Sequence, residues 1–221
     1  MQEKFGLDLW SWEDLFAKSL EGIIYYTFEE EVADVILWYI YEHYLAEDPE
    51  DKVIKTPERK FKQDYAEYEW KWYLEGNRDA KEIGQIAKIW NNMMIPGTTN
   101  VNSNYGFFWN YNNQLRKVVS ELRRNKESRR AIVLHYLIHE MDQYKYDTPC
   151  NIALNFYIKD GVLNLTVFAR SIDLVYGFSN DQYTFAKLME KVAEELAMPL
   201  GNMHWFVTNL HIYPRHYELI K

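Results

Sequence analysis

Cysteine is almost absent, because Cys150 is the only one among 221 residues. A single thiol has no partner within the chain, so a disulfide framework is excluded and a reducing compartment is expected. Long hydrophobic runs are also lacking: the most apolar stretch, residues 32–45, contains Asp34, Glu42 and His43 and is too short and too charged to cross a bilayer. The first ten residues lack the basic and apolar segments of a signal peptide. We therefore expect a cytoplasmic protein without a membrane partner.

Positive charge is scarce as well. The chain has 25 Lys and Arg against 33 Asp and Glu, which gives a net charge of -8. This balance argues against a nucleic acid polymer as the main partner, whereas a small anionic substrate needs only a local cluster of arginines. No linker rich in Pro, Gly or Ser and no repeat divides the chain, so residues 1–221 are expected to form a single domain.

Hydrophobic periodicity predicts a sheet that carries helices from both ends of the chain. Residues 151–158 and 162–170 are expected to form a hairpin closed by a tight turn at Lys159, Asp160 and Gly161. Further strands are predicted over 131–138 and 205–213, and helices over 12–47, 58–75 (closed by Gly76), 110–125 and 181–197, with a loop over 95–106. This pattern is typical of an α+β fold with helices flanking a mixed sheet.

Six short motifs occur in order between about residues 65 and 216. They read EWKWYLEG, NSNYGFFW, ESRR, TPCN, ARSIDLVYGFSND and LHIYPRH. Together they resemble, in order and approximate spacing, the active-site segments of the thymidylate synthase family. Within that family the wording most resembles phage deoxycytidylate hydroxymethylases, and after them the short archaeal thymidylate synthases. The resemblance implies the thymidylate synthase-like fold, a homodimer formed through the sheets, and methylenetetrahydrofolate as co-substrate, with no metal.

The resemblance also implies roles for individual residues. Cys150 would be the nucleophile that adds to carbon 6 of the pyrimidine, and Glu69 would organise water and move protons. The phosphate and ribose would be held by Arg170, Ser171, His211 and Tyr213, and by Arg129 and Arg130 from the partner subunit. The folate and base cavity would include Trp90, Tyr105 and Asp173. The arginine charge is expected to lower the pKa of the Cys150 thiol.

Asp181 bears on the choice of substrate, because thymidylate synthases have an asparagine at the matching position. An amide matches the N–H and carbonyl of uracil, whereas a carboxyl can accept from the amino group of cytosine and share a proton with its ring nitrogen. Asp181 therefore favours dCMP and also takes a catalytic role. A one-residue shift to Asn180 would restore the uracil reading. The expected activity is dCMP 5-hydroxymethyltransferase; thymidylate synthase, dUMP hydroxymethylase and dCMP methylase are the alternatives.

Three departures from the family pattern stand out. Residues 1–60 contain no counterpart of the phosphate-gripping arginine loop, and Asn151 replaces the histidine that commonly follows the cysteine. The sequence ends soon after Tyr213, without the long segment that closes over folate in larger synthases. A more open site would let water reach the transferred carbon, which favours a hydroxymethyl product.

Plainer readings exist for most of these residues. A lone cysteine is commonly just buried, and RRNKESRR can be a solvated basic surface. His135 and His139 have the i, i+4 spacing of metal ligands on a helix, but a strand is predicted there, so they are read as loop histidines. A dimer that binds nucleotide without turning it over is the alternative outside the enzymes.

Overall fold

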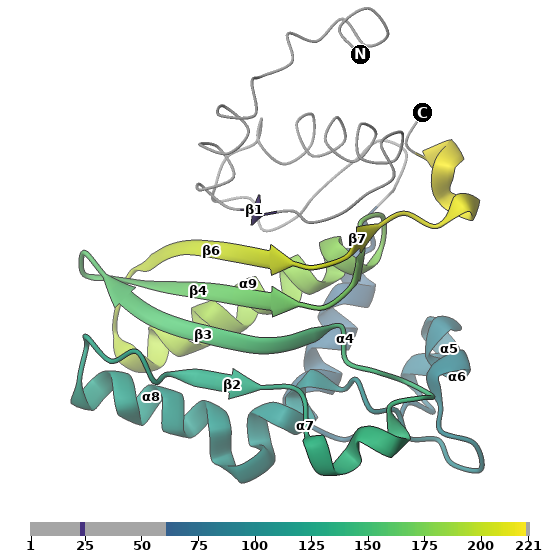
Figure 1. The fold of residues 1–221 in the computed structure, drawn as a ribbon, viewed down its shortest axis with the longest axis horizontal. Helices are drawn as coiled ribbons and strands as arrows, with labels where there is room; N and C mark the ends of the chain where they lie inside the picture. The colour runs from purple at the N-terminus through teal and green to yellow at the C-terminus, as the bar shows by residue number, and fades with distance from the viewer. Residues whose placement is uncertain (1–22, 25–60, 220–221) are drawn as a thin grey trace, which may run out of the picture.

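A mixed five-stranded sheet forms the centre of the protein (Figure 1). The computed structural model describes residues 23–24 and 61–219. Within these residues the strand order is β1-β6-β4-β3-β2. The strands are β1 (Ile23–Ile24), β2 (Ile132–Leu134), β3 (Asn151–Lys159), β4 (Val162–Ala169) and β6 (Leu200–Val207). The β2-β3-β4 pairs are antiparallel and the β4-β6-β1 pairs are parallel.

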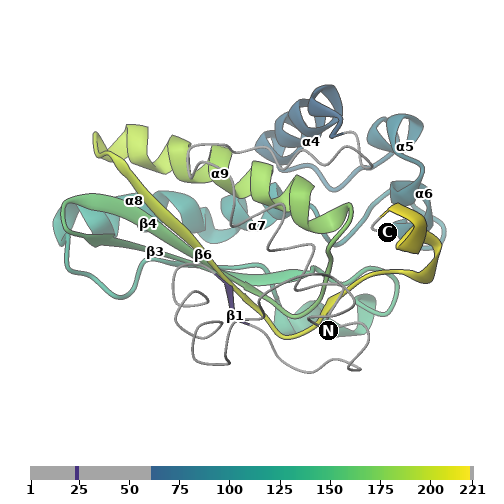
Figure 2. The same ribbon diagram turned by 90° about the horizontal axis from the view of Figure 1, so that it is seen from above.

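The helices lie on one face of this sheet (Figure 2). The two long ones, α8 (Gln114–Arg124) and α9 (Gly177–Leu196), pack against each other. The others are α4 (Gln63–Glu75), α5 (Ile83–Ile86), α6 (Ile89–Met93) and α7 (Tyr105–Asn110), with short 3-10 turns η1 (Tyr111–Asn113), η2 (Ile138–Gln143) and η3 (Pro214–Leu219). A second, parallel pair joins β5 (Ile172–Asp173) to β7 (Leu210–His211). The predicted α+β class with a mixed sheet is confirmed.

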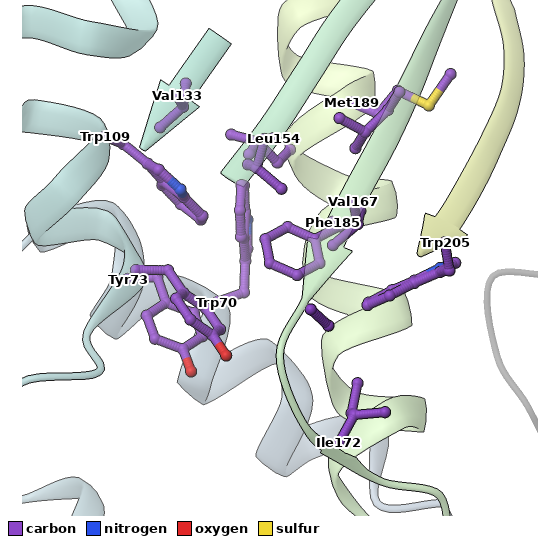
Figure 3. Packing of buried hydrophobic residues seen from close by; sticks show 14 of the residues in the cluster. Trp70, Tyr73, Trp109, Val133, Leu154, Val167, Ile172, Phe185, Met189 and Trp205 are labelled. Atoms are coloured by element: carbon purple, nitrogen blue, oxygen red, sulfur yellow. The ribbon is translucent and has the colours of Figure 1, made fainter. Parts of the chain in front are cut away.

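Aromatic side chains fill the space between the helices and the sheet (Figure 3). Phe185 of α9 is fully buried, with its ring centroid 5.7 Å from that of Trp205 on β6 and 5.4 Å from that of Tyr105 on α7. Trp70 of α4 lies 5.7 Å from Trp109 of α7. Large rings bury much apolar surface each, so this core fixes α4, α7 and α9 relative to the strands that carry the motifs.

Glycine allows α4 and α7 to approach each other closely. A Cβ atom on Gly106 would lie 1.5 Å from the carbonyl oxygen of Tyr73, so no larger residue fits without moving the backbone. At the end of α4, Gly76 adopts a left-handed conformation with φ 64°, which is the helix-ending geometry that the sequence predicts. The close approach at Gly106 and the end of α4 at Gly76 place the EWKWYLEG and NSNYG segments side by side.

The strand β2 forms one edge of the sheet, and a side chain covers its outer backbone groups. The Gln114 amide accepts from the backbone N–H of Leu134 (2.8 Å) and donates to its carbonyl (2.9 Å). The same Nε2 also donates to the carbonyl of Phe108 (2.9 Å). Gln114 therefore satisfies the groups that a further strand would otherwise use.

Several predicted elements keep their place but change their ends. The hairpin turn is confirmed, because Asp160 and Gly161 have φ values of 53° and 82°, as a tight β-hairpin requires. The helix predicted over 110–125 starts only at Gln114, since Asn112 and Asn113 have positive φ values of 52° and 56°. The helix predicted over 181–197 begins earlier, at Gly177.

Three predictions about strands and helices are wrong in part. Within the stretch 12–47, predicted as helical, Ile23–Ile24 form the strand β1, which pairs in parallel with Trp205 and Phe206; the rest of that stretch lies outside the described residues. The strand predicted over 205–213 is two strands, β6 and β7. The strand predicted over 131–138 shortens to β2.

In the described part of the chain, no helix combines the length and apolar character needed to span a membrane.

Candidate active site

Arg170 holds the loop that carries Cys150. The loop ends where β3 begins, and Arg170 follows directly after β4, so the two residues are neighbours across the β3-β4 pair. The Arg170 backbone N–H donates to the carbonyl of Cys150 (2.9 Å). Its guanidinium donates to the carbonyls of Pro149 (3.0 Å) and Thr148 (2.8 Å). The expected nucleophile and phosphate-binding arginine are thus brought together, and Arg170 is exposed.

The Cys150 thiol is harder to ionise than the sequence suggests. Its pKa is raised to about 12, chiefly by burial and then by the nearby Asp181, whereas Arg170 lowers it. The expected lowering by arginine is therefore present but is outweighed within one chain. Formation of a thiolate requires a base that takes the proton or additional positive charge near the sulfur.

Asp181 lies in the second turn of α9, at the bottom of the site. Its Oδ2 accepts from the Asn151 side-chain amide (2.8 Å), and Tyr105 also donates to the carboxyl. Burial raises the pKa of Asp181 to about 7, although the bonds from Asn151 and Tyr105 oppose that rise. Near neutral pH this carboxyl can therefore give or take a proton, which is the property of an acid-base group.

Asn151 connects three parts of the site. It is fully buried, and its Nδ2 donates both to Asp181 and to the Tyr105 hydroxyl (2.8 Å). The backbone carbonyl of Asn151 lies 3.1 Å from Nδ1 of His135, and Nε2 of the same ring accepts from the Trp109 indole N–H (3.1 Å). Since Nε2 is an acceptor, Nδ1 carries the proton and donates to the backbone carbonyl of Asn151.

This arrangement leaves His135 as a structural residue. It is fully buried, and burial lowers its pKa to about 3, so the ring is neutral. His139 is exposed on η2. No group of three or more His, Cys, Asp or Glu side chains suited to a metal occurs among residues 23–24 and 61–219. The i, i+4 spacing of the two histidines does not form a helical pair, because a strand end and a loop separate them.

Glu69 sits in a chain of hydrogen bonds that sequence reasoning missed. It is buried on α4, and the Tyr65 hydroxyl one helical turn earlier donates to its Oε1 (2.5 Å). The Trp90 indole N–H donates in turn to the Tyr65 oxygen (2.9 Å). The i, i+4 spacing of Tyr65 and Glu69 on a predicted helix was the available signal. Trp90 is therefore connected to Glu69 through the hydroxyl of Tyr65.

Glu69, Asp181 and Cys150 surround one group of phenols. Burial raises the pKa of both Tyr73 and Tyr105 well above the ordinary value, and Glu69 and Asp181 each raise it further. Cys150 adds to the effect at Tyr105. Such effects fall off with distance, so Tyr105 lies near all three expected catalytic residues.

Three of the residues expected to bind ribose and phosphate lie next to one another. The β5-β7 pair brings Ser171 Oγ within 3.5 Å of His211 Nδ1. The exposed Tyr213 ring stands edge-on to His211, with 4.9 Å between ring centroids. The carboxyl of Asp173 accepts from the backbone N–H of Tyr176 (3.1 Å) and lies 3.8 Å from His216 Nδ1, a partner that the sequence reading did not single out.

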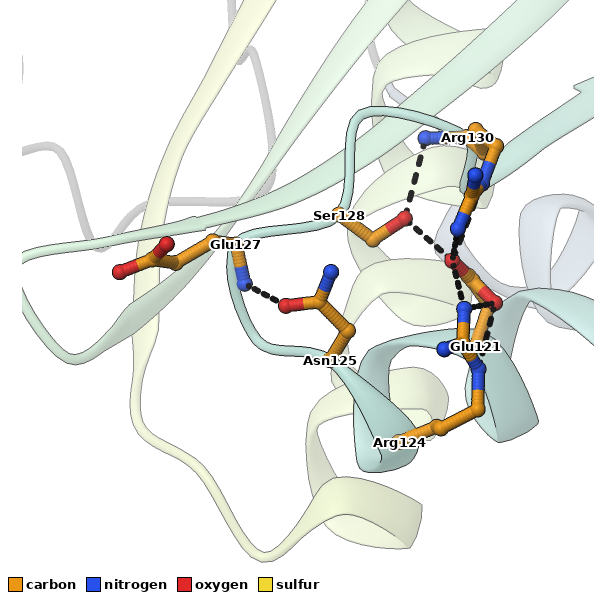
Figure 4. A network of polar contacts seen from close by, with 6 residues as sticks. All are labelled: Glu121, Arg124, Asn125, Glu127, Ser128 and Arg130. Atoms are coloured by element: carbon orange, nitrogen blue, oxygen red, sulfur yellow. Dashed lines mark hydrogen bonds and ion pairs between the residues drawn. The ribbon is translucent and has the colours of Figure 1, made fainter.

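Arg129 and Arg130 are not part of this site within the same chain. They precede β2, at the end of the strand register far from Cys150, and both are exposed. Arg130 donates to Glu121 (3.0 Å), which also accepts from Arg124 and Ser128 (Figure 4). These bonds lower the pKa of Glu121 to about 2, with the bond from Ser128 contributing most. Glu121 thus holds one member of the arginine pair in an outward position.

Asp147 ties the NSNYG segment to the cysteine loop. Its Oδ2 accepts from the backbone N–H groups of Asn102 and Ser103 (2.7 Å each) and from the Ser103 hydroxyl (2.8 Å). Burial raises the pKa of Asp147, and these three bonds oppose the rise. No local pattern indicates this contact, because Ser103 and Asp147 are 44 positions apart in the chain.

The chain is similar to known proteins over most of its length. The thymidylate synthase family model matches residues 46–221. Deoxycytidylate 5-hydroxymethyltransferase of Enterobacteria phage T4 is 30% identical over 174 residues, which cover 71% of this chain and 70% of the phage protein. Thymidylate synthase of Buchnera aphidicola subsp. Acyrthosiphon pisum (strain APS) is 26% identical over 163 residues, covering 70% of this chain and 61% of that protein. The chain belongs to the thymidylate synthase family.

Proposed function

We propose that the protein is a dCMP 5-hydroxymethyltransferase. Enzymes of the thymidylate synthase family transfer one carbon from methylenetetrahydrofolate to carbon 5 of a pyrimidine nucleoside monophosphate, and this chain is such an enzyme. The observation that carries the finer proposal is the buried carboxyl of Asp181, which lies close enough to Cys150 to raise the pKa of its thiol and itself has a pKa of about 7.

The carboxyl supports cytosine for a chemical reason. The Cys150 thiolate forms a bond to carbon 6, and the electron pair of the carbon 5–carbon 6 double bond shifts through the ring onto N3. Protonated Asp181 donates its proton to N3 and neutralises that charge, while its other oxygen keeps the bond from Asn151. Carbon 5 then becomes an enamine carbon that can attack an electrophile. Uracil already carries a proton on N3, so it gains less from this acid.

The second half of the reaction involves Glu69. Methylenetetrahydrofolate supplies an electrophilic one-carbon unit at carbon 5. Glu69 is buried beside the Tyr65 hydroxyl and can hold water and move the proton that leaves carbon 5. Tetrahydrofolate then leaves the transferred carbon, and water adds to that carbon to give the hydroxymethyl group. Elimination of the Cys150 sulfur from carbon 6 restores the carbon 5–carbon 6 double bond, and the N3 proton returns to Asp181.

Three residues are proposed to line the folate and base cavity. Trp90 offers its ring, because its N–H is already bonded to Tyr65. Tyr105 belongs to the base side, since its hydroxyl bonds with Asn151 and Asp181. Asp173 is half-buried, with its oxygens near backbone N–H groups and His216.

A homodimer through the sheet is proposed to complete the site. The sheet face turned away from the helices exposes Ile132 (44%), Leu134 (50%) and Phe206 (40%), and Phe206 stacks on Phe168 with centroids 5.3 Å apart. Burial of such an apolar face favours association. A second copy on this face would carry Arg129 and Arg130 toward the neighbouring phosphate site and add positive charge near the thiol.

A paired product assay tests the proposal. The protein is incubated with methylenetetrahydrofolate and either dCMP or dUMP, and the products are identified by mass. We expect dCMP to gain a hydroxymethyl group and dUMP to react much more slowly. Turnover of dUMP without dCMP would refute the substrate, and a methylated product would refute the reaction. Cys150→Ser should abolish turnover; nucleotide binding without any exchange of the carbon 5 hydrogen in the wild type would indicate a non-catalytic binding protein.

A further inference from the structure

Asn151 has one polar atom that the fold leaves unused. The residue is fully buried, yet its Oδ1 has no hydrogen-bond partner among the residues that the structure describes. A buried polar atom without a partner is costly. In a site that takes a polar ligand, such an atom is a candidate contact, and Asn151 directly follows the nucleophile Cys150.

The neighbours of Asn151 determine which way its amide faces. The Tyr105 hydroxyl donates to Asp181, so its oxygen is left as an acceptor. The Asp181 Oδ2 is an acceptor as well. Both partners therefore require N–H donors, and both hydrogens of the Asn151 Nδ2 are used, at 2.8 Å each. The same amide has only its Oδ1 left, which can accept a hydrogen bond but cannot donate one.

From this geometry we infer that Asn151 is a specificity-determining residue that acts with Asp181 to select an amino-bearing pyrimidine. The inference rests on the proposed function, in which Asp181 faces the base. Asn151 fixes Oδ2 of Asp181 as an acceptor, so the proton of the carboxyl resides on Oδ1, where it can reach N3 of cytosine. The side-chain Oδ1 of Asn151, which has no other partner among the described residues, then accepts from the exocyclic amino group of cytosine.

Uracil meets the opposite conditions at the same place. Its carbonyl at carbon 4 needs a donor, but the Asn151 N–H groups and the Tyr105 hydroxyl are already committed to each other and to Asp181. The uracil carbonyl would face an acceptor and remain unpaired. Sites that leave a buried polar group unpaired reject the wrong ligand strongly. The Asn151 amide, whose two N–H groups are both in use, therefore adds to the discrimination between cytosine and uracil that Asp181 provides.

Two variants change the committed amide in different ways. Asn151→Ala removes the acceptor, and we expect the preference for dCMP over dUMP to fall by about 10- to 100-fold. Tyr105→Phe removes one acceptor from Nδ2 and keeps the Asn151 side chain, so one N–H becomes free to serve the uracil carbonyl. We expect dUMP to bind more tightly relative to dCMP in that variant. Thr184→Val is the matched control, because Thr184 is buried on α9 and its hydroxyl also lacks a partner among the described residues.

The measurements are the dissociation constants of dCMP and dUMP by calorimetry and the ratio of their kcat/KM values, with thermal melting as the check on folding. The control variant Thr184→Val should keep the dCMP-to-dUMP ratio of dissociation constants and that of kcat/KM values within about twofold of the wild type. A wild type that prefers dUMP would refute the proposed function itself. A wild-type preference for dCMP that persists unchanged in both folded variants would refute the role of Asn151 alone. If Asn151→Ala does not fold, Tyr105→Phe decides the question.

Discussion

The buried carboxyl of Asp181 should make the stability of the protein depend on pH in a way that one substitution removes. The pKa of this group is raised from 3.8 to about 7 by burial. The groups that face it are Asn151 and Tyr105, which bond to it, and Cys150, Tyr65 and Tyr73, whose pKa values it raises. All of these are uncharged near neutral pH.

The sign and size follow from proton linkage. Between pH 3.8 and about 7 the folded protein keeps the Asp181 proton and the unfolded chain loses it, so the contribution of Asp181 to stability falls as pH rises. The loss is about 1.4 kcal/mol per pH unit, about 4 kcal/mol in all. Asp181→Asn has no charge to bury, so its stability relative to the wild type should rise by that amount from pH 4 to pH 8.

Denaturant unfolding of both proteins at several pH values measures this difference. The comparison is needed because buried His135 has the opposite dependence and partly cancels that of Asp181 in the wild type. Thr184→Val serves as the control, because it changes a buried polar group on the same helix without changing charge. If the free energies of unfolding of wild type and Asp181→Asn run parallel from pH 4 to pH 8, the carboxyl is ionised in the folded protein and the acid role assigned to it is wrong.

Three further outcomes are expected. Tyr65→Phe removes the hydrogen bond to Glu69, so kcat should fall about 10-fold; an unchanged kcat would show that this bond does not position Glu69. Gly106→Ala places a Cβ 1.5 Å from the Tyr73 carbonyl and should cost about 3 kcal/mol, seen as a fall of about 6–12 °C in Tm, and a normal Tm would contradict it. Nitrogen NMR should find His135 neutral, with its proton on Nδ1, and titration near pH 6.5 would contradict the buried tautomer.

Local signals in the sequence predicted the parts of the fold that depend on neighbouring residues. The turn at Asp160 and Gly161 and the helix end at Gly76 both need a left-handed backbone conformation. Gly and Asp are residue types that tolerate this conformation, so the sequence indicates it. The break before α8 was missed, although Asn112 and Asn113 are residues that tolerate that conformation. The strand β1 could not be predicted, because its hydrogen bonds come from β6, far along the chain.

The candidate site shows the same division. The motifs located Cys150, Arg170 and Asp181, and the structure places Arg170 and Asp181 near Cys150. Their electrostatics were not predictable, because the raised pKa of Cys150 depends first on burial, which the sequence does not display. The role of Asn151 emerges only from three partners on different elements, two of them at 2.8 Å from a single nitrogen atom.

The covered edge of β2 has a consequence for how copies of this chain can aggregate. An open edge strand is a template for fibrillar growth, since any extended segment can add to its free backbone groups. Gln114 closes both such groups of Leu134 with one side chain, and the strand is only three residues long. Replacing Gln114 by Leu would reopen a polymerisation-prone edge next to exposed Ile132 and Leu134. The Gln114 amide and the shortness of β2 therefore both work against amyloid-like assembly at this end of the sheet.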